Sequence, residues 1–460
     1  MLPDYVLLEI FDFWRKSLPG YLKDWHLLVH VCQRWRQIVF ASPLRLNLQI
    51  LCTKSTPVRT HLGIWPAIPI IIHYIGMAPH DEDNLVAALE HPDRVCQLLL
   101  FTLGPSLEKV VTVMQGPFPV LTCLQIGSRF GKAPPVFPAK FLGGSAPCLQ
   151  EFYLDSISFP ALPTLLLSAS GLVVVHLLYI PPTGYISPEV MTMVLAGLAK
   201  LCTFHFGFQL ATSRPDQIRP PPITRTGLPV LTDFEFRGAT EYLEDFIARI
   251  DCPQLSRISI IYQNELVDSQ VARLFKFVDR SVGPEITQFR RARVTFSDYQ
   301  VTFTLYPHTN HQGRDRCSVG TTISCEAIDW EAFYAAQALS QFSATFSTLV
   351  HLELVVQFEA GYELEGTDDV VWLHLLHQFP TVQTLHVSSE LAELIALALE
   401  GITGDMVTEV LPSLDLICLD GKPASSIRIF LAVRQLSGRP VTVVDTKTEF
   451  DQRLESYVSK

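Results

Sequence analysis

The chain lacks several sequence signatures, and each absence argues against a class of protein. No Asn-x-Ser/Thr sequon occurs, and none of the ten cysteines forms a Cys-x-x-Cys pair. The N-terminus also has no basic leader, so we expect an intracellular protein of the cytoplasm or nucleus. The Gly-x-x-x-x-Gly-Lys-Ser/Thr, Gly-x-Gly-x-x-Gly and Gly-x-Ser-x-Gly motifs are missing too. We therefore expect no enzyme and no cofactor.

Positive charge is scarce. The chain has 35 Lys and Arg against 46 Asp and Glu, a net charge of −11. This balance argues against a nucleic-acid partner, which needs a basic face, and against an anionic membrane surface. Charged residues make up 18% of the chain and hydrophobic residues 48%, so the chain can bury a large core. Residues 161–180 are long enough to span a membrane, but Pro163 and Gly171 interrupt them, and we favour a repeat there.

Metal-binding patterns are weak. His308 and His311 are three residues apart, as are His374 and His377. Neither pair has a cysteine or carboxylate at ligand spacing, and structural metal sites usually need such further ligands. We interpret the first pair as part of a turn and the second as a helix flank, and we expect no metal.

The most regular feature of the chain is an apolar triplet of the form L-x-x-L-x-L. Ten triplets begin at Val95, Leu121, Leu149, Leu172, Leu201, Leu231, Leu255, Leu349, Val382 and Leu414. Except for one gap, they lie roughly 23–33 residues apart, near the length of a leucine-rich repeat. Amphipathic, helix-length segments lie between several of them, such as residues 105–115 and 240–250. Each unit is therefore predicted to be strand, loop and helix.

Two segments interrupt this pattern. Residues 207–228 are rich in proline and predict an exposed loop. Residues 287–347 predict one distorted repeat that carries a strand hairpin near 294–305, a polar turn over 308–315 and a helix over 328–339. Three arginines at its start, Arg290, Arg291 and Arg293, are interpreted as a solvated strand edge.

The pattern resembles the ribonuclease-inhibitor-like leucine-rich-repeat proteins. The resemblance implies an α/β fold, an irregular horseshoe with parallel strands inside and helices outside, preceded here by a short helical module. In such a repeat the residue between the second and third apolar positions points away from the core. We predict that this face binds a target protein. The alternative is that it is simply the exposed side of a sheet. The candidate target-binding residues at this position are Gln125, Tyr153, His176, His205, Glu235, Glu353 and His386, and the flanking columns add Arg237 and Arg257.

The first forty residues predict two short amphipathic helices. Val6, Leu7, Ile10 and Phe11 have helical spacing. The second stretch would place six residues on one apolar face, with Cys32 as a packing cysteine. These six are Leu28, Val31, Cys32, Trp35, Ile38 and Val39.

These residues resemble an F-box, through Leu2-Pro3 at the start and Val31-Cys32-Gln33-Arg34-Trp35-Arg36 at the end. The stretch Phe40-Ala41-Ser42-Pro43, which follows, is similar to the same region in the expanded F-box families of basidiomycete fungi. The resemblance implies docking on a Skp-family adaptor and, through it, on a cullin. The implied adaptor-binding residues are Leu2, Pro3, Val6, Leu7, Ile10, Phe11, Val31, Cys32 and Trp35.

The sequence thus predicts four segments. They are an F-box module (1–43), a connecting or capping region (44–93), a leucine-rich-repeat domain (94–445, distorted around 287–347) and a polar tail (446–460). The predicted function is a substrate receptor of a Skp–cullin–F-box ubiquitin ligase with an unidentified target protein. The alternative is a non-catalytic scaffold with a vestigial F-box, because residues 15–24 are longer and more polar than usual in that motif.

Overall fold

The computed structural model divides the chain into two compact units, Met1–Gln209 (unit 1) and Leu210–Lys460 (unit 2). This division lies inside the segment predicted to be one repeat domain, and the predicted boundaries stay predictions. The structure describes residues 2–17, 28–41, 48–51, 58–64, 69–75, 81–102, 104–128, 134–210, 224–263, 272–282, 289–297, 300–307, 318–324, 348–357, 369–402, 409–420 and 427–445. The predicted helix over 328–339, the polar turn, most of the proline-rich loop and the tail lie outside them.

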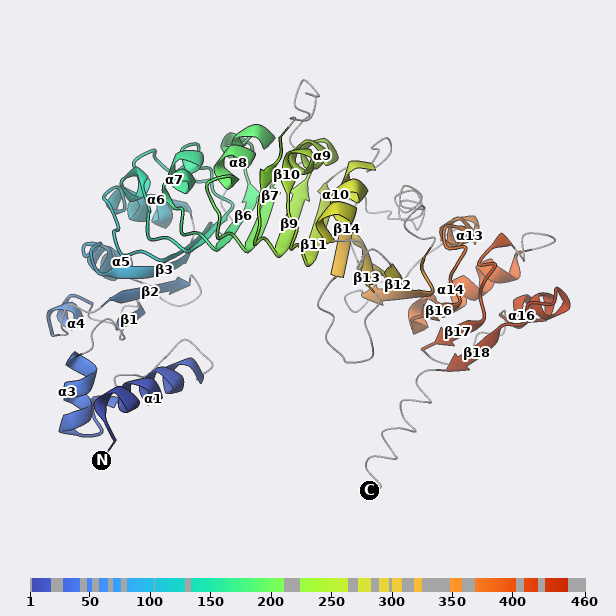
Figure 1. The fold of residues 1–460 in the computed structure, drawn as a ribbon, viewed down its shortest axis with the longest axis horizontal. Coiled ribbons are helices and arrows are strands. Elements are labelled where there is room, and N and C mark those ends of the chain that lie inside the picture. The colour runs from blue at the N-terminus through green and yellow to red at the C-terminus, as the bar shows by residue number, and fades with distance from the viewer. Residues whose placement is uncertain are drawn as a thin grey trace. The chain divides into compact units, whose positions relative to one another are not determined.

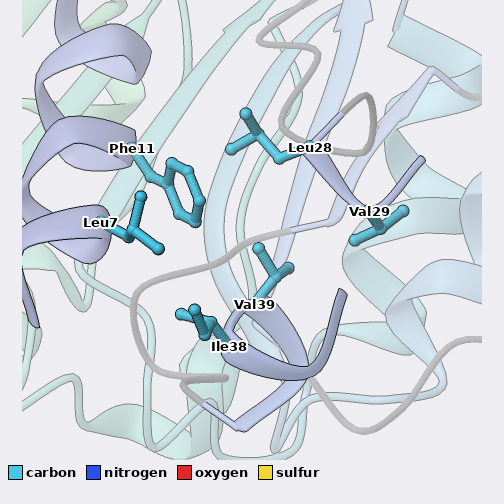
Figure 2. Close-up of a cluster of buried hydrophobic side chains, with 6 residues drawn as sticks. All are labelled: Leu7, Phe11, Leu28, Val29, Ile38 and Val39. Carbon is cyan, nitrogen blue, oxygen red and sulfur yellow. The ribbon is translucent and has the colours of Figure 1, made fainter. Parts of the chain in front are cut away.

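The N-terminal module, residues 2–41, is built on helices α1 (Asp4–Ser17) and α3 (Gln33–Ala41). Asp4 lies in the first turn of α1, where a carboxylate favours the positive end of the helix. Figure 2 shows the module's own core, in which side chains from α1, α3 and the segment before α3 meet. The core residues are Leu7, Phe11, Leu28, Val29, Ile38 and Val39. The module therefore buries apolar side chains of its own.

The rest of unit 1 is built on one parallel sheet in which each strand pairs with the next one in sequence. Its strands are β1 (Leu48–Leu51), β2 (Ile70–Ile75), β3 (Val95–Thr102), β4 (Cys123–Ser128), β5 (Glu151–Asp155), β6 (Val174–Ile180) and β7 (Thr203–Phe208). Strands β3 to β7 arise from the first five predicted triplets. Strands β1 and β2 lie in the region predicted to connect or cap, and they extend the same sheet.

Helices cover one face of this sheet (Figure 1). They are α4 (Val58–Ile64), α5 (Glu82–Leu89), α6 (Gly104–Val113), α7 (Leu162–Ser168) and α8 (Pro188–Leu195), with 3-10 turns η2 (Phe141–Gly144) and η3 (Pro182–Gly184). The second and third apolar residues of each triplet point to the helices and are buried, as Phe152 and Leu154 are. Alternation along a strand turns the residues between them to the opposite face, here called the open face.

One turn recurs before the strands of both units and explains why the triplets are so regular. The backbone N–H of the first apolar residue donates to the carbonyl three residues earlier, and that apolar side chain is buried. The pairs include Leu121–Phe118, Leu149–Ala146, Leu172–Ala169, Leu201–Leu198, Leu231–Leu228, Leu255–Cys252, Val382–Phe379 and Leu414–Leu411. Each turn satisfies the N–H of the first apolar residue and places its side chain in the core, so the same turn begins one strand after another.

Unit 2 also contains a sheet, in the order β9-β11-β14-β13-β12-β15-β16-β17-β18. These strands are β9 (Asp233–Gly238), β11 (Arg257–Gln263), β12 (Phe289–Ser297), β13 (Gln300–Pro307), β14 (Ser318–Ser324), β15 (His351–Gln357), β16 (Thr384–Val387), β17 (Leu416–Leu419) and β18 (Thr442–Asp445). A second, two-stranded sheet joins β8 (Thr226–Gly227) and β10 (Ile250–Asp251).

The distorted repeat is a three-stranded antiparallel insertion. β12 and β13 form an antiparallel hairpin, and β14 pairs antiparallel with β13. This confirms the predicted hairpin. The outer strands of the insertion continue the parallel pattern, because β14 pairs with β11 and β12 pairs with β15. The arginine-bearing strand β12 therefore has a partner on each side, and the prediction of a strand edge was wrong.

The helices described in unit 2 are α9 (Thr240–Arg249), α10 (Ala272–Val282), α13 (Asp369–His377), α14 (Ser389–Glu400) and α16 (Ile427–Leu436). In α16 the Arg434 side chain is fully buried. Its Nη2 donates to the carbonyls of Leu414 at 3.0 Å and Leu411 at 3.4 Å, and its guanidinium carbon lies 5.8 Å from the centroid of the Phe430 ring. The turn before β17 thus provides two carbonyl acceptors for this buried cation.

The structure confirms the predicted fold class, an α/β protein of repeated parallel strands and helices behind a short helical module. Residues 161–180, which have the length of a membrane span, fold as α7, a turn and β6. No helix in the described ranges is both long and apolar enough to cross a membrane.

Candidate functional site

The N-terminal module leaves apolar side chains exposed although its core is filled. Leu2 is 52% exposed, Ile10 44% and Val31 59%. Tyr5, Phe13 and Phe40 are exposed as well, and so is Pro3. We name Leu2, Pro3, Ile10 and Val31 the docking patch. All four belong to the residues for which the F-box resemblance implies adaptor contact.

The other five residues for which the F-box resemblance implies adaptor contact are not all at the surface. Leu7 and Phe11 are buried, and Val6 and Trp35 are half-buried. The Trp35 ring lies 4.7 Å from that of Phe11, centroid to centroid. Cys32 is exposed, so the prediction of a packing cysteine was wrong. The reason is that α3 begins at Gln33, and residues before it do not share the helix's apolar face.

Arg34 organises the docking patch, a role that the sequence reasoning missed. Its Nη2 lies 2.6 Å from Asp4 Oδ1 and also donates to the backbone carbonyl of Leu2. Arg36 donates from Nε to the Val29 carbonyl at 2.9 Å. The two arginines therefore hold the start of α1 and the segment before α3 against the same helix. The sequence could have suggested this contact, because an acidic residue, Asp4, opens the motif and basic residues, Arg34 and Arg36, close it.

On the open face of unit 1 the strand registers align one residue from each strand. His73, Leu99, Gln125, Tyr153, His176 and His205 are successive partners across β2 to β7. Four of the predicted target-binding residues, Gln125, Tyr153, His176 and His205, therefore lie in one row. Each of the four is half-buried, so each is accessible from solvent. Their part in target binding stays a prediction.

Aromatic rings make contact along this row. The His176 and His205 rings are stacked with centroids 4.2 Å apart, and Tyr153 lies 5.6 Å from His176. Phe101 meets Tyr153 edge-on at 5.9 Å across strand β4. Gly127 lies between them, and a Cβ there would stand 2.5 Å from the Phe101 ring. The glycine thus provides the room that lets Phe101 lie over β4, a contact that the triplet pattern could not indicate.

Two carboxylates flank Tyr153 on strand β5. Glu151 is exposed and Asp155 half-buried. Asp155 accepts hydrogen bonds from Ser156 Oγ at 2.8 Å and, weakly, from Tyr153 Oη at 3.5 Å. Glu151 accepts from the Cys123 thiol at 3.4 Å. Burial and the Glu151 carboxylate raise the pKa of Cys123 to about 12, so this thiol stays neutral. We name Phe101, Glu151, Tyr153 and Asp155 the acidic–aromatic patch.

Unit 2 has its own row on the corresponding face of its sheet. Glu235 is the partner of Ser259 on one side of the insertion, and Glu353, His386 and Cys418 are successive partners on the other. Arg293 of β12 is the partner of Glu353. The predicted residues Glu235, Glu353 and His386 thus lie at the expected positions, and Arg293 joins them.

Glu353 is the centre of a charged network. Arg291 Nη2 lies 2.8 Å from its Oε2, Arg293 Nη2 2.9 Å from its Oε1, and His386 Nδ1 3.7 Å from Oε1. Although it points to the open face, Glu353 is only 8% exposed because these partners cover it. Burial by itself would raise the pKa of Glu353, but hydrogen bonds from His386, Arg293 and Arg291 outweigh it and hold the pKa well below its usual value.

His386 extends the network to β17. Its Nε2 lies 2.9 Å from Asp420 Oδ1, so the imidazole bridges two carboxylates. The hydrogen bond with Glu353, together with Asp420, raises the pKa of His386 against the opposing effect of burial. The protonated imidazole is therefore favoured in the fold.

The two predicted target-binding arginines lie on β9 and β11. Arg257 Nη1 lies 3.3 Å from Asp233 Oδ2, an ion pair at the surface, and Arg237 is half-buried two residues after Glu235 on the same strand. Both arginines are thus accompanied by carboxylates of β9. Arg291 and Arg293, which the sequence indicated as a solvated strand edge, also lie on this face and pair with Glu353.

Within the described ranges, no three His, Cys, Asp or Glu side chains are grouped closely enough to hold a metal ion. His374 and His377 lie in the last turn of α13, as the predicted helix flank. His308 and His311 lie outside the described residues.

Comparison with known proteins identifies no family, because no family model matches the chain. No curated protein matches it either. Among solved structures, the leucine-rich-repeat-containing protein LegL7 from Legionella pneumophila is similar over 86% of this chain and 99% of its own, with 13% identity and a TM-score of 0.27. A TM-score this low does not by itself show a shared fold.

Proposed function

We propose that this chain is a substrate receptor of a Skp–cullin–F-box ubiquitin ligase. The N-terminal module docks the Skp-family adaptor, and the open face of the strands binds a target protein. The observation that carries the proposal is the docking patch. Leu2, Ile10 and Val31 are exposed on a module that already has a core, at positions matching the F-box motif. Exposed apolar side chains that gather on one small module are typical of interaction sites.

The docking patch is the part of the module that contacts the adaptor directly. Leu7 and Phe11 act indirectly, because they hold α1 against α3 within the core. Arg34 holds the Leu2 end beside α3. In this proposal the nine motif residues therefore divide between direct contact with the adaptor and support from the core.

The chain contributes proximity rather than bond chemistry. A target held on the sheet and a ubiquitin-carrying assembly held on the module meet at a raised effective concentration. The docking patch and the β3–β7 face both belong to unit 1, so one compact unit carries both sites.

The experiment is a pull-down of purified Skp-family adaptor by the full chain and by the double variant Ile10→Asp, Val31→Asp. Both residues are exposed, so folding changes little, whereas a carboxylate in an apolar contact is strongly unfavourable. We expect adaptor capture to fall at least about thirtyfold, as for hot-spot residues. Undiminished capture by the double variant contradicts the docking claim.

The matched control is Leu167→Asp with Met193→Asp. These residues are 50% and 56% exposed on α7 and α8, so the control makes the same chemical change elsewhere in unit 1. We expect the control to bind adaptor normally. If the intact, folded chain does not bind adaptor at all, the scaffold function with a vestigial F-box takes the place of this proposal.

A further inference from the structure

Strands β3 to β7 of unit 1 carry acidic charge without basic charge. Strands β3 to β7 contain no lysine or arginine, and their only acidic residues are Glu151 and Asp155. Among the residues that the structure describes, neither carboxylate forms an ion pair. Their hydrogen-bond donors are a thiol and two hydroxyls, which are neutral. The two negative charges are therefore not balanced within these strands.

Aromatic surface lies directly between these charges. Tyr153 stands between Glu151 and Asp155 on β5, and Phe101 reaches it over Gly127. The face of an aromatic ring attracts a cation, and a nearby carboxylate strengthens that attraction. The combination of rings and carboxylates suits an ammonium or guanidinium group with an aliphatic stem, because the stem packs on the rings while the charge meets the acids.

We infer that the acidic–aromatic patch binds a basic segment of the target protein, with an arginine or lysine side chain lying on Phe101 and Tyr153 between Glu151 and Asp155. The inference rests on the proposed function for the existence of a protein target, and it specifies that target's chemistry. Charge complementarity selects the occupant, since an acidic or phosphorylated segment would be repelled by both carboxylates.

The probe is a fluorescein-labelled peptide of alternating glycine and arginine, titrated with the full chain by fluorescence anisotropy at low salt. The control peptide contains citrulline in place of arginine, which keeps the shape and removes the charge. We expect the arginine peptide to bind, the citrulline peptide to bind much more weakly, and added salt to weaken the arginine complex.

The test variant is Glu151→Gln with Asp155→Asn, which is nearly isosteric. We expect its affinity for the arginine peptide to fall at least about fivefold. The matched control is Asp93→Asn with Glu108→Gln, two exposed residues outside the strands, which changes net charge equally. Tyr153→Ala should weaken binding as well, because it removes the ring between the two acids.

The inference is overturned if the folded wild-type chain does not bind the arginine peptide, or if the test variant binds it as tightly as the control variant. The adaptor pull-down separates this result from the proposed function. Adaptor capture without peptide binding rejects the basic target and leaves docking intact. Peptide binding without adaptor capture rejects the ligase function and leaves the acidic–aromatic patch as a binding surface.

Discussion

The open faces of the two units use the same strand geometry and differ in how their charges are balanced. In unit 1, Glu151 and Asp155 have neutral hydrogen-bond donors. In unit 2, Glu353 is covered by two arginines and a histidine. A carboxylate whose charge is met inside the molecule contributes to stability, whereas one whose charge is not met remains available to a partner. We therefore expect the Glu353 network to act mainly in stability, while the inferred binding role belongs to the acidic–aromatic patch.

The largest expected effect comes from removing Glu353 of unit 2, and Glu151 of unit 1 is the comparison. Glu353→Ala leaves Arg291 and Arg293 without their shared partner and should destabilise unit 2 by about 2–3 kcal/mol. Glu151→Ala should change the stability of unit 1 by less than about 0.5 kcal/mol, since the side chain is exposed. Hydrogen exchange of the strand amides in each unit, measured by mass spectrometry, checks both values. Equal destabilisation would remove the contrast between the faces.

A smaller effect is expected at Gly127. A Cβ at this position would stand 2.5 Å from Phe101 Cδ1 and 3.5 Å from Asp155 Cβ, so Gly127→Ala must displace the Phe101 ring. We expect unit 1 to lose about 1 kcal/mol of stability and the arginine peptide to bind more weakly. Gly63→Ala, where a Cβ would meet nothing within 4 Å, is the control. Unchanged peptide binding by a folded Gly127→Ala chain would mean that Phe101 has no part in the patch.

The pH dependence of unit 2 should come next in size. The pKa of His386 is raised in the fold, so its pairing stabilises the folded state fully below the unfolded value near 6.5 and is lost as pH rises through the folded value. His386→Ala should therefore cost about 1 kcal/mol at about pH 5.5 and less at about pH 8.5. Urea unfolding at the two pH values measures this. A larger cost at the higher pH would contradict the assigned protonation.

The smallest effect is expected at the surface pair of Arg257 and Asp233. The arginine is 65% exposed in its side chain, and solvent screens such a pair. Arg257→Ala should change the stability of unit 2 by less than about 0.5 kcal/mol. The same hydrogen exchange measures this change. A loss near that of Glu353→Ala would show that one surface ion pair stabilises unit 2 as much as the whole network around Glu353.

Much of the fold could be predicted because one buried pattern repeats. The ten triplets each became a strand whose second and third apolar residues point to the helices, and in at least eight of them the first apolar residue closes a backbone turn. The row of outward residues followed from alternation alone. Helices α6 and α9 also formed within a residue or two of the predicted bounds.

The charged network around Glu353 could not be predicted from the sequence, because strand order decides which residues become partners. Arg293 and Glu353 are sixty residues apart, and only the antiparallel insertion brings β12 beside β15. Cys32 was misplaced for a local reason, because α3 begins one residue after it. The room that Gly127 gives to Phe101 depends on a ring crossing a strand, which no periodicity encodes.

Hydrogen exchange of the full chain with and without adaptor tests the central claim most directly, because it locates the contact. We predict that bound adaptor slows exchange in residues 2–13 and 28–41, which carry the docking patch, and leaves exchange in β3 to β7 unchanged. We also predict that Ile10→Asp with Val31→Asp abolishes the protection. Protection confined to the strands, or absent from the N-terminal module of a chain that captures adaptor, would contradict the proposed docking.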